Sequence, residues 1–192
     1  MEFQHVNVKV FVEGELPFDP SRFINVFHQW IQEQALPEML IDVADYCHVP
    51  EGPGVLLVAH EADYSMDHTD GRWGLRYNRK AVVPGTNDDR FRQALAAAAA
   101  ACCRLEQGSA PGLKFSRTQF EVFINDRALA PNTRDVLADF QSELLASLAG
   151  VLGRNEFRLK APPDPRRRVG AIVTASRPID LETVRALSMA KT

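Results

Sequence analysis

Hydrophobic and polar residues alternate along a short stretch near the start of each half of the chain. Residues 6–12 (VNVKVFV) and 118–124 (TQFEVFI) follow the period of two that is typical of a β-strand with one buried face. Each stretch is followed by a turn and then by a segment of helical periodicity, residues 20–34 and 133–149. In the first of these segments the apolar side chains form one continuous helix face. The pattern therefore predicts a strand followed by a helix in each half.

Further strand-like runs follow both predicted helices. Runs 39–44 and 54–60 follow the first helix, and runs 155–160 and 169–175 follow the second. Because strands and helices are mixed and joined by short loops, the predicted fold class is α+β (mixed α/β).

Each half also ends in a helical segment, residues 88–107 in the first half and 180–190 in the second. The shared order predicts a duplicated β-α-β-β-α unit, with residues 1–107 and 108–192 as two copies in one compact, pseudo-symmetric domain. The alternative is that two ordinary α/β halves merely look alike. The alanine-rich helix 88–107 is expected to pack tightly in the core, or else to form a dimer interface.

Residues 61–80 are predicted to form a β-hairpin inserted in the first copy, because Asp70-Gly71 is a strong turn signal. A two-residue loop sets Tyr64 opposite Tyr77, whereas a four-residue loop shifts the register by two residues. Both registers place the acids and bases on one face and the aromatic residues on the other. The acids of the hairpin then have basic partners nearby, which makes them poor catalytic candidates.

Charge is divided unequally along the chain. Residues 23–71 contain no Lys or Arg, but they contain nine carboxylates and four of the five histidines. The part before Gly71 carries 2 basic and 13 acidic residues, and the part after it carries 20 basic and 12 acidic residues. The net charge of −3 thus combines −11 with +8. This split predicts attraction between the two halves or between two subunits, and a homodimer is expected.

Composition indicates a soluble cytoplasmic protein without a membrane partner. With 45% hydrophobic residues the chain can bury a substantial core. No apolar run approaches the roughly 20 residues that cross a bilayer, and the N-terminus lacks the pattern of a signal peptide. Three cysteines without a CxxC pair suit a reducing compartment.

The acidic, histidine-bearing stretch suggests a divalent metal site. Asp42, Asp45 and His48 are the candidate ligands, since carboxylate and imidazole suit zinc, iron or manganese. If strands 39–44 and 54–60 form a hairpin, His60 lies about 20 Å from His48 and cannot share the same ion. No other cofactor is expected.

Two further ideas concern single residues. Asp42 interrupts an apolar strand, and a buried carboxylate must be paired or have a raised pKa; Arg158 or Arg127 is its expected partner. His28, at the edge of the apolar helix face, and His60 are candidate ligand-site residues, although such histidines usually contact backbone or water. No nucleophile motif accompanies them, so the sequence names no catalytic residue.

Basic residues after Gly71 suggest a contact with nucleic acid. Arg166-Arg167-Arg168 and the strand from Arg72 to Tyr77 combine cations with aromatic rings. The net negative charge favours the other interpretation, a solvated loop or a contact with the acidic half.

Several sequence blocks resemble a family of uncharacterised bacterial proteins of similar length. The blocks are FHQWIQ, LIDVADYCHVPEGPGVLLVAHEADYSMD, GLRYNRK and INDRALAPNT. The resemblance spans most of the chain and implies no particular activity, substrate or catalytic residue.

The preferred interpretation is a non-catalytic module that binds a small ligand or a partner, because capping, turn formation and packing account for most of the notable residues. The first alternative is a metal-assisted hydrolase that uses the Asp/His cluster. The weaker alternative is nucleic-acid binding. Whether the chain is an enzyme is left open.

Overall fold

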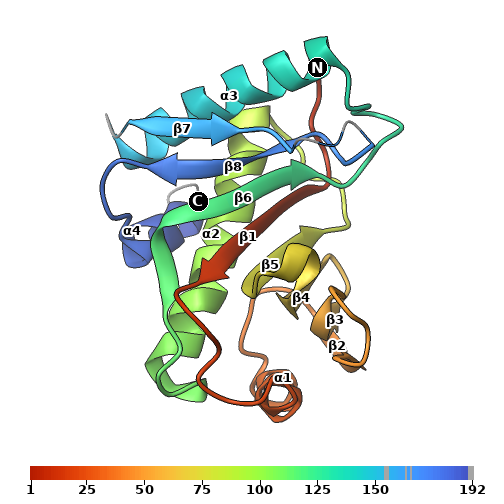
Figure 1. Ribbon diagram of the computed structural model, residues 1–192, viewed down its shortest axis with the longest axis vertical. Coiled ribbons are helices and arrows are strands. Elements are labelled where there is room, and N and C mark those ends of the chain that lie inside the picture. The colour runs from red at the N-terminus through yellow and green to blue at the C-terminus, as the bar shows by residue number, and fades with distance from the viewer. Residues whose placement is uncertain (154–155, 163, 165, 190–192) are drawn as a thin grey trace.

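The computed structural model describes residues 1–153, 156–162, 164 and 166–189 (Figure 1). An antiparallel eight-stranded sheet with the order β2-β3-β4-β5-β1-β6-β8-β7 forms its centre. The strands are β1 (Val6–Val12), β2 (Leu40–Tyr46), β3 (Gly54–Ala59), β4 (Ala62–Asp67), β5 (Gly74–Arg79), β6 (Phe115–Ile124), β7 (Phe157–Lys160) and β8 (Gly170–Ala175).

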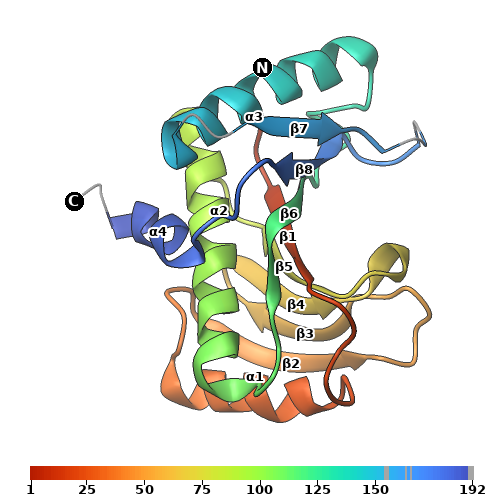
Figure 2. The ribbon, with the colours of Figure 1, turned by 60° about the vertical axis from the view of Figure 1, so that its left-hand side comes forward.

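The helices gather on one side of this sheet (Figure 2). Helix α2 contacts β1 and β5 and is flanked by α3 and α4, while α1 packs beside β2 and β3. In the part of the chain that the structure describes, no α-helix covers the opposite side, which we call the open face. The helices are α1 (Arg22–Glu33), α2 (Asn87–Arg104, continued by a π-helical turn Leu105–Ser109), α3 (Arg134–Leu152) and α4 (Leu181–Arg185, continued by a 3-10 turn Ala186–Met189).

The main core lies between the sheet and the helices. Alternate residues of β1, such as Val8 and Val10, point into it and are buried, as the period of two predicts. Trp30 of α1 is fully buried there. Several alanines of α2, among them Ala94 and Ala98, are also fully buried. The alanine-rich helix therefore packs tightly against its neighbours, as expected.

The α+β class is confirmed, and the predicted helices and strands occur with shifted ends among the described residues. Residue 155 of the predicted strand 155–160 and residue 190 of the predicted helix 180–190 lie outside the described residues. The first helix begins at Arg22 instead of residue 20, and Ser21 takes the N-cap position. Asp19 still supports this turn, because its Oδ1 accepts a hydrogen bond from the Ser21 backbone N–H at 2.9 Å.

The predicted hairpin 61–80 forms β4 and β5, with Tyr64 opposite Tyr77. The two tyrosines face the core and Asp63, Asp67 and Arg76 face the open side, so the predicted division of faces is confirmed for these residues. Arg79 is the exception, because it pairs with Ala62 on the side of the tyrosines. The turn is longer than a two-residue loop. It contains a 3-10 turn, Thr69–Gly71, in which Asp70 has a φ of 64°.

The two halves of the chain share the sheet through direct pairing of β1 with β6. On its other side β1 pairs with β5, whereas β6 pairs with β8. The hairpin β4–β5 thus lies between β3 and β1, so β5 rather than β3 occupies the position in the first half that β8 has in the second. The strand order does not show the predicted correspondence of β3 with β8, and the duplication stays a prediction.

Candidate anion site on the open face

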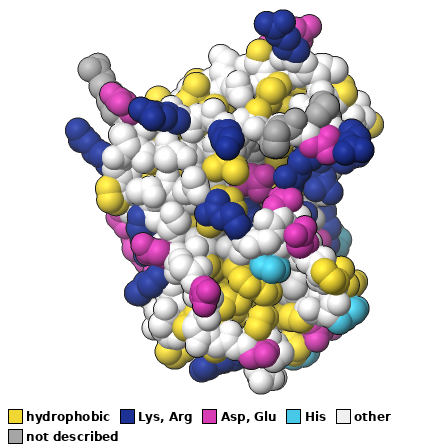
Figure 3. Space-filling model, in the orientation of Figure 1, with side chains coloured by type: hydrophobic (Ala, Val, Ile, Leu, Met, Phe, Trp, Pro, Cys, Tyr) yellow, Lys and Arg dark blue, Asp and Glu magenta, His cyan; other side chains and the backbone are white. Residues whose placement is uncertain are grey.

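A row of polar and charged side chains crosses the open face. Directly paired residues of neighbouring strands share one face of a sheet, so the register of six strands defines this row. Figure 3 shows basic and acidic side chains side by side near the centre of this face. The row consists of Ser65, Arg76, Lys9, Glu121, Ile172 and Lys160.

Lys9 and Asp67 form a buried ion pair beneath the open face. Lys9 Nζ lies 2.6 Å from Asp67 Oδ1, and the two side chains are 3% and 1% exposed. Lys9 Nζ also donates to the carbonyl oxygen of Thr69 at 2.9 Å. Arg76 adds a second cation, with its Nη1 at 3.1 Å from Asp67 Oδ2. Burial lowers the pKa of Lys9, although Asp67 acts in the opposite direction. Because its ammonium is held by these partners, Lys9 has a structural role here.

A cavity of about 310 Å³ opens above this row. The sheet supplies Arg76, Glu121 and Phe123, and the segment before β8 supplies Arg168. The Arg76 and Arg168 guanidinium carbons lie 5.2 and 5.5 Å from the centroid of the Phe123 ring. The volume is at the lower end of the range of small-molecule sites, which is roughly 300–1,000 Å³.

The cavity carries an excess of positive charge. Six basic and four acidic side chains line it, which leaves two formal positive charges. Asp67 neutralises one of the two positive charges of Lys9 and Arg76. Arg167 pairs with Asp70 across the mouth of the cavity. An exposed pair, Arg166 with Asp164 at 3.1 Å, makes no net contribution. Glu121 offsets one further cation.

The remaining charge belongs to Arg127 and Arg168, both exposed at the rim. Among the described residues neither of them forms an ion pair. Partial burial lowers the pKa of Arg168, and the neighbouring cations Arg76, Arg127 and Arg167 act in the same direction. These two guanidinium groups have no acidic partner among the described residues, and ions from the solvent can reach them. They therefore form a candidate anion site.

Glu121 lies half-buried between Lys9 and Ile172 on the floor of the cavity. Burial raises the pKa of Glu121, and this effect outweighs the opposing influence of Lys9, Arg167 and Arg76. The cavity therefore combines cations at its rim with a carboxyl group at its floor.

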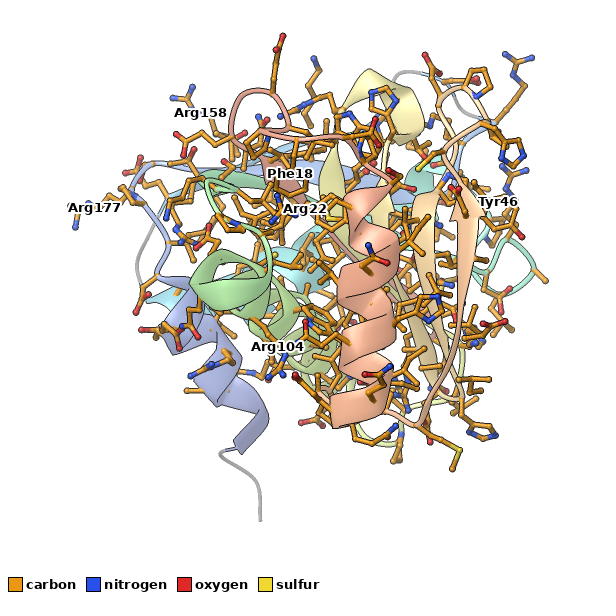
Figure 4. All side chains as sticks on the ribbon, turned by 90° about the horizontal axis from the view of Figure 1, so that it is seen from below. Phe18, Arg22, Tyr46, Arg104, Arg158 and Arg177 are labelled. Atoms are coloured by element: carbon orange, nitrogen blue, oxygen red, sulfur yellow. The ribbon has the colours of Figure 1, made fainter. Side chains whose placement is uncertain are left out.

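Asp42 does not have the predicted environment. It is exposed on β2, an edge strand, and its Oδ1 accepts a hydrogen bond from the Val43 backbone N–H at 2.8 Å. The predicted pairing with Arg158 or Arg127 is wrong, since β2 and β7 form opposite edges of the sheet. Figure 4 shows Arg158 and Tyr46, from these two edge strands, on opposite sides of the molecule. An edge strand with a bulge leaves Asp42 in water, so it needs no buried partner.

Asp45 is exposed near the end of β2, where it pairs with Val55, and His48 is exposed in the turn that follows. Asp45 Oδ1 accepts a hydrogen bond from the Cys47 backbone N–H at 2.8 Å, which lowers the pKa of Asp45. The His48 ring stacks on Tyr46 with 6.4 Å between the ring centroids. These contacts account for both side chains without a ligand.

The other candidate histidines lie elsewhere. The predicted hairpin of β2 and β3 is confirmed and places His60 at the end away from His48. His60 Nδ1 lies 3.4 Å from Glu61 Oε1, and its side chain is 70% exposed. His28 is exposed on α1. Within the described ranges, no three His, Cys, Asp or Glu side chains are grouped closely enough to hold a metal ion. The candidate ligands are thus scattered.

Sequence reasoning missed the central role of Lys9 and Glu121. Each residue occupies the middle of an alternating strand, at a position that the period of two assigns to the polar face. The segments VNVKVFV and TQFEVFI contain that signal. The sequence does not indicate that these two strands pair with each other, because the pairing joins residues more than 100 positions apart.

No helix in the described part of the chain is both long and apolar enough to cross a bilayer. Comparisons of the chain with protein-family models, with curated proteins and with solved structures found no match.

Proposed function

We propose that this protein is a binding module for a small dianionic ligand, most specifically a phosphate monoester, held in the cavity on the open face. The observation that carries the proposal is the pair of rim guanidinium groups, Arg127 and Arg168, that lack acidic partners among the described residues. Guanidinium groups bind phosphate oxygens through charge-assisted, often bidentate hydrogen bonds.

The charge of the cavity supports this ligand class. A phosphate monoester carries about −1.5 to −2 at pH 7, which matches the excess of two positive charges along the cavity wall. The apolar Phe123 ring between Arg76 and Arg168 holds these two cations in place and offers a surface for the organic part of a ligand.

Titration with inorganic phosphate tests the proposal, with isothermal calorimetry and thermal melting as readouts. We expect saturable binding to the wild-type protein and a rise in Tm. Arg168→Gln should weaken the binding at least about tenfold, because a hydrogen bond to a charged group contributes about 1.5–3 kcal/mol.

Arg166→Gln is the matched control. Arg166 belongs to the same arginine run, but it is exposed and already paired with Asp164. Its substitution should change the phosphate affinity by less than about twofold. Equal losses in both variants would show a diffuse charge effect and would contradict a defined site.

Single-stranded nucleic acid is the second candidate ligand, favoured by one observation. A second hollow of about 240 Å³ shares Glu121 and Arg167 with the cavity and adds Arg72 and Lys160. The Arg72 guanidinium carbon lies 3.7 Å from the centroid of the Phe11 ring, so cations and an aromatic ring continue along the open face. A mobility assay with a homopolymeric DNA strand separates the two functions. Lys160 should contribute to binding of the DNA strand but not to binding of the phosphate monoester, since it lines only the second hollow.

Other expectations stay predictions. The charge split favours a homodimer, which sedimentation at several protein concentrations tests.

A metal-assisted hydrolase with Asp42, Asp45 and His48 is the less favoured alternative, and metal analysis of the purified protein tests it. The duplicated β-α-β-β-α unit would place the cavity where the two copies meet, because Lys9 and Arg76 come from the first half and Arg127 and Arg168 from the second.

A further inference from the structure

Glu121 is the carboxylate of the cavity that accepts no hydrogen bond from a described residue. It lies at the centre of the open face and lines both the main cavity and the adjoining hollow. The Arg167–Asp70 pair borders both spaces, so Glu121 lies where they meet.

The neighbouring cations direct their hydrogen bonds to other acceptors. Lys9 Nζ donates to Asp67 and to the Thr69 carbonyl oxygen. Arg76 donates to Asp67 and to Asn7, and Arg167 donates to Asp70. Among the described residues, none donates a hydrogen bond to the Glu121 carboxylate. These cations therefore stabilise Glu121 only through space.

Glu121 is half-buried, and its carboxylate is not among the fully buried polar groups without a partner, so water has to supply its hydrogen bonds in the ligand-free protein. Its partial removal from water costs free energy. The raised pKa of Glu121 has the same origin, since burial disfavours its charged form. A donor that enters the cavity from solvent would satisfy this carboxylate.

We propose that the ligand carries a hydroxyl group that donates to Glu121 while its phosphate group contacts Arg127 and Arg168. The ligand class is then a small hydroxylated phosphate monoester, such as a polyol phosphate or a sugar phosphate. This inference rests on the proposed function and specifies its ligand. A cavity of about 310 Å³ is large enough for a molecule of this size.

Two probes that differ only in hydroxyl groups test the inference. Glycerol 3-phosphate and propyl phosphate share the same phosphate ester, so Arg127 and Arg168 should hold both. Calorimetry should show that the wild-type protein binds glycerol 3-phosphate about tenfold more tightly, as expected for a hydrogen bond to a charged acceptor. In Glu121→Met this preference should fall below about twofold, and the affinity for propyl phosphate should not decrease.

The outcomes separate the two proposals. If the wild-type protein binds both probes equally, the role of Glu121 is wrong and the anion site stands. The wild-type comparison decides this point even if Glu121→Met does not fold. If neither probe nor inorganic phosphate binds, the proposed function itself is wrong. A preference for glycerol 3-phosphate that persists in Glu121→Met would also overturn the inference, because the hydroxyl groups would then have another acceptor.

Discussion

Arg76 and Arg168 place their guanidinium groups over the same aromatic ring, 5.2 and 5.5 Å from the centroid of Phe123. Arg76 belongs to β5 of the first half and Arg168 to the segment before β8 of the second. The two guanidinium groups therefore place like charges close together on the open face, and Arg127 and Arg167 contribute to the same positive potential. This relationship has consequences for stability as well as for binding.

Substitution of Arg168 should make the ligand-free protein less sensitive to salt. Repulsion among exposed cations is screened as ionic strength rises, so the Tm of the wild-type protein should increase between about 20 mM and about 0.5 M NaCl. In Arg168→Gln that increase should be smaller, because one of the repelling charges is absent. Thermal melting of both proteins across this range of salt concentration measures the two increases in Tm. Equal increases would contradict repulsion between Arg168 and the neighbouring cations.

The Lys9–Asp67 pair should be important for stability. Lys9→Met leaves the buried Asp67 with Arg76 as its remaining cation, and breaking a buried ion pair costs about 3–5 kcal/mol. The half-buried i,i+4 pair of Arg92 with Asp88 on the surface of α2, 2.7 Å apart, is the control. Arg92→Gln should cost less than about 1 kcal/mol. Urea unfolding gives both free energies, and similar losses in the two variants would refute a special role for the buried pair.

Gly54 should not tolerate a side chain. It begins β3 with a φ of +62°, and an added Cβ would overlap the carbonyl oxygen of Met66 in the neighbouring strand. Gly54→Ala should therefore destabilise the protein by more than about 3 kcal/mol.

Gly14 provides the comparison for Gly54, because its φ is +77° and nothing lies within 4 Å of an added Cβ. Gly14→Ala should cost only the backbone strain, about 1–2 kcal/mol. Denaturant unfolding of both variants measures the contribution of the close strand approach. Equal costs would mean that β3 and β4 can move apart at this point.

Glu121 should make the free energy of unfolding fall as pH rises. Its pKa in the folded protein lies above the ordinary value of 4.5, so the folded state binds more protons than the unfolded state between these two values. The folded state therefore loses stability as pH increases through this window, and the loss is complete above the folded pKa.

Glu121→Gln removes this contribution while the other acids of the chain remain. The difference in unfolding free energy between variant and wild type should thus favour the variant near pH 7 and shrink toward pH 4. Urea unfolding at a series of pH values measures that difference. A difference that does not vary with pH would show that Glu121 titrates normally.

Cys47 should react slowly with thiol reagents although the residue is exposed. Partial burial of the thiol and, to a smaller extent, Asp45 raise the pKa of Cys47 to about 11, from an ordinary value of 9.0. Near pH 8 the reactive thiolate is then about a hundredfold rarer than in an ordinary cysteine. Alkylation followed by mass spectrometry gives the rate, and Asp45→Asn should accelerate it. Fast labelling of the wild-type residue would contradict the raised pKa.

Local patterns predicted much of the fold. Alternation in residues 6–12 and 118–124 located two strands that form the centre of the sheet, and the Asp70-Gly71 signal located the hairpin but left two registers open, of which the structure has the one with Tyr64 opposite Tyr77. These features depend on neighbours in sequence. The order of the strands depends instead on contacts between distant residues, and so the position of β5 beside β1 was not foreseen.

The candidate site was harder to predict for the same reason. Lys9, the hairpin residues Asp67 and Arg76, Glu121 and Arg168 come from separate parts of the chain. The sequence singled out Arg76 and Arg168 for a contact with nucleic acid, but it did not bring them together with Lys9 and Glu121. The acidic stretch drew attention to Asp42 and His48, whose charge and residue type were conspicuous. Their position at an exposed edge and turn explains why they do not meet.

The pairing of β1 with β6 also bears on how the polypeptide is synthesised. Strand β1 leaves the ribosome before its partner β6, so the central ladder can close only after residues 115–124 have been synthesised. Until then an apolar strand edge is exposed to other nascent chains. Separately produced fragments 1–107 and 108–192 would each present such an edge, and each would complete the sheet of the other when mixed.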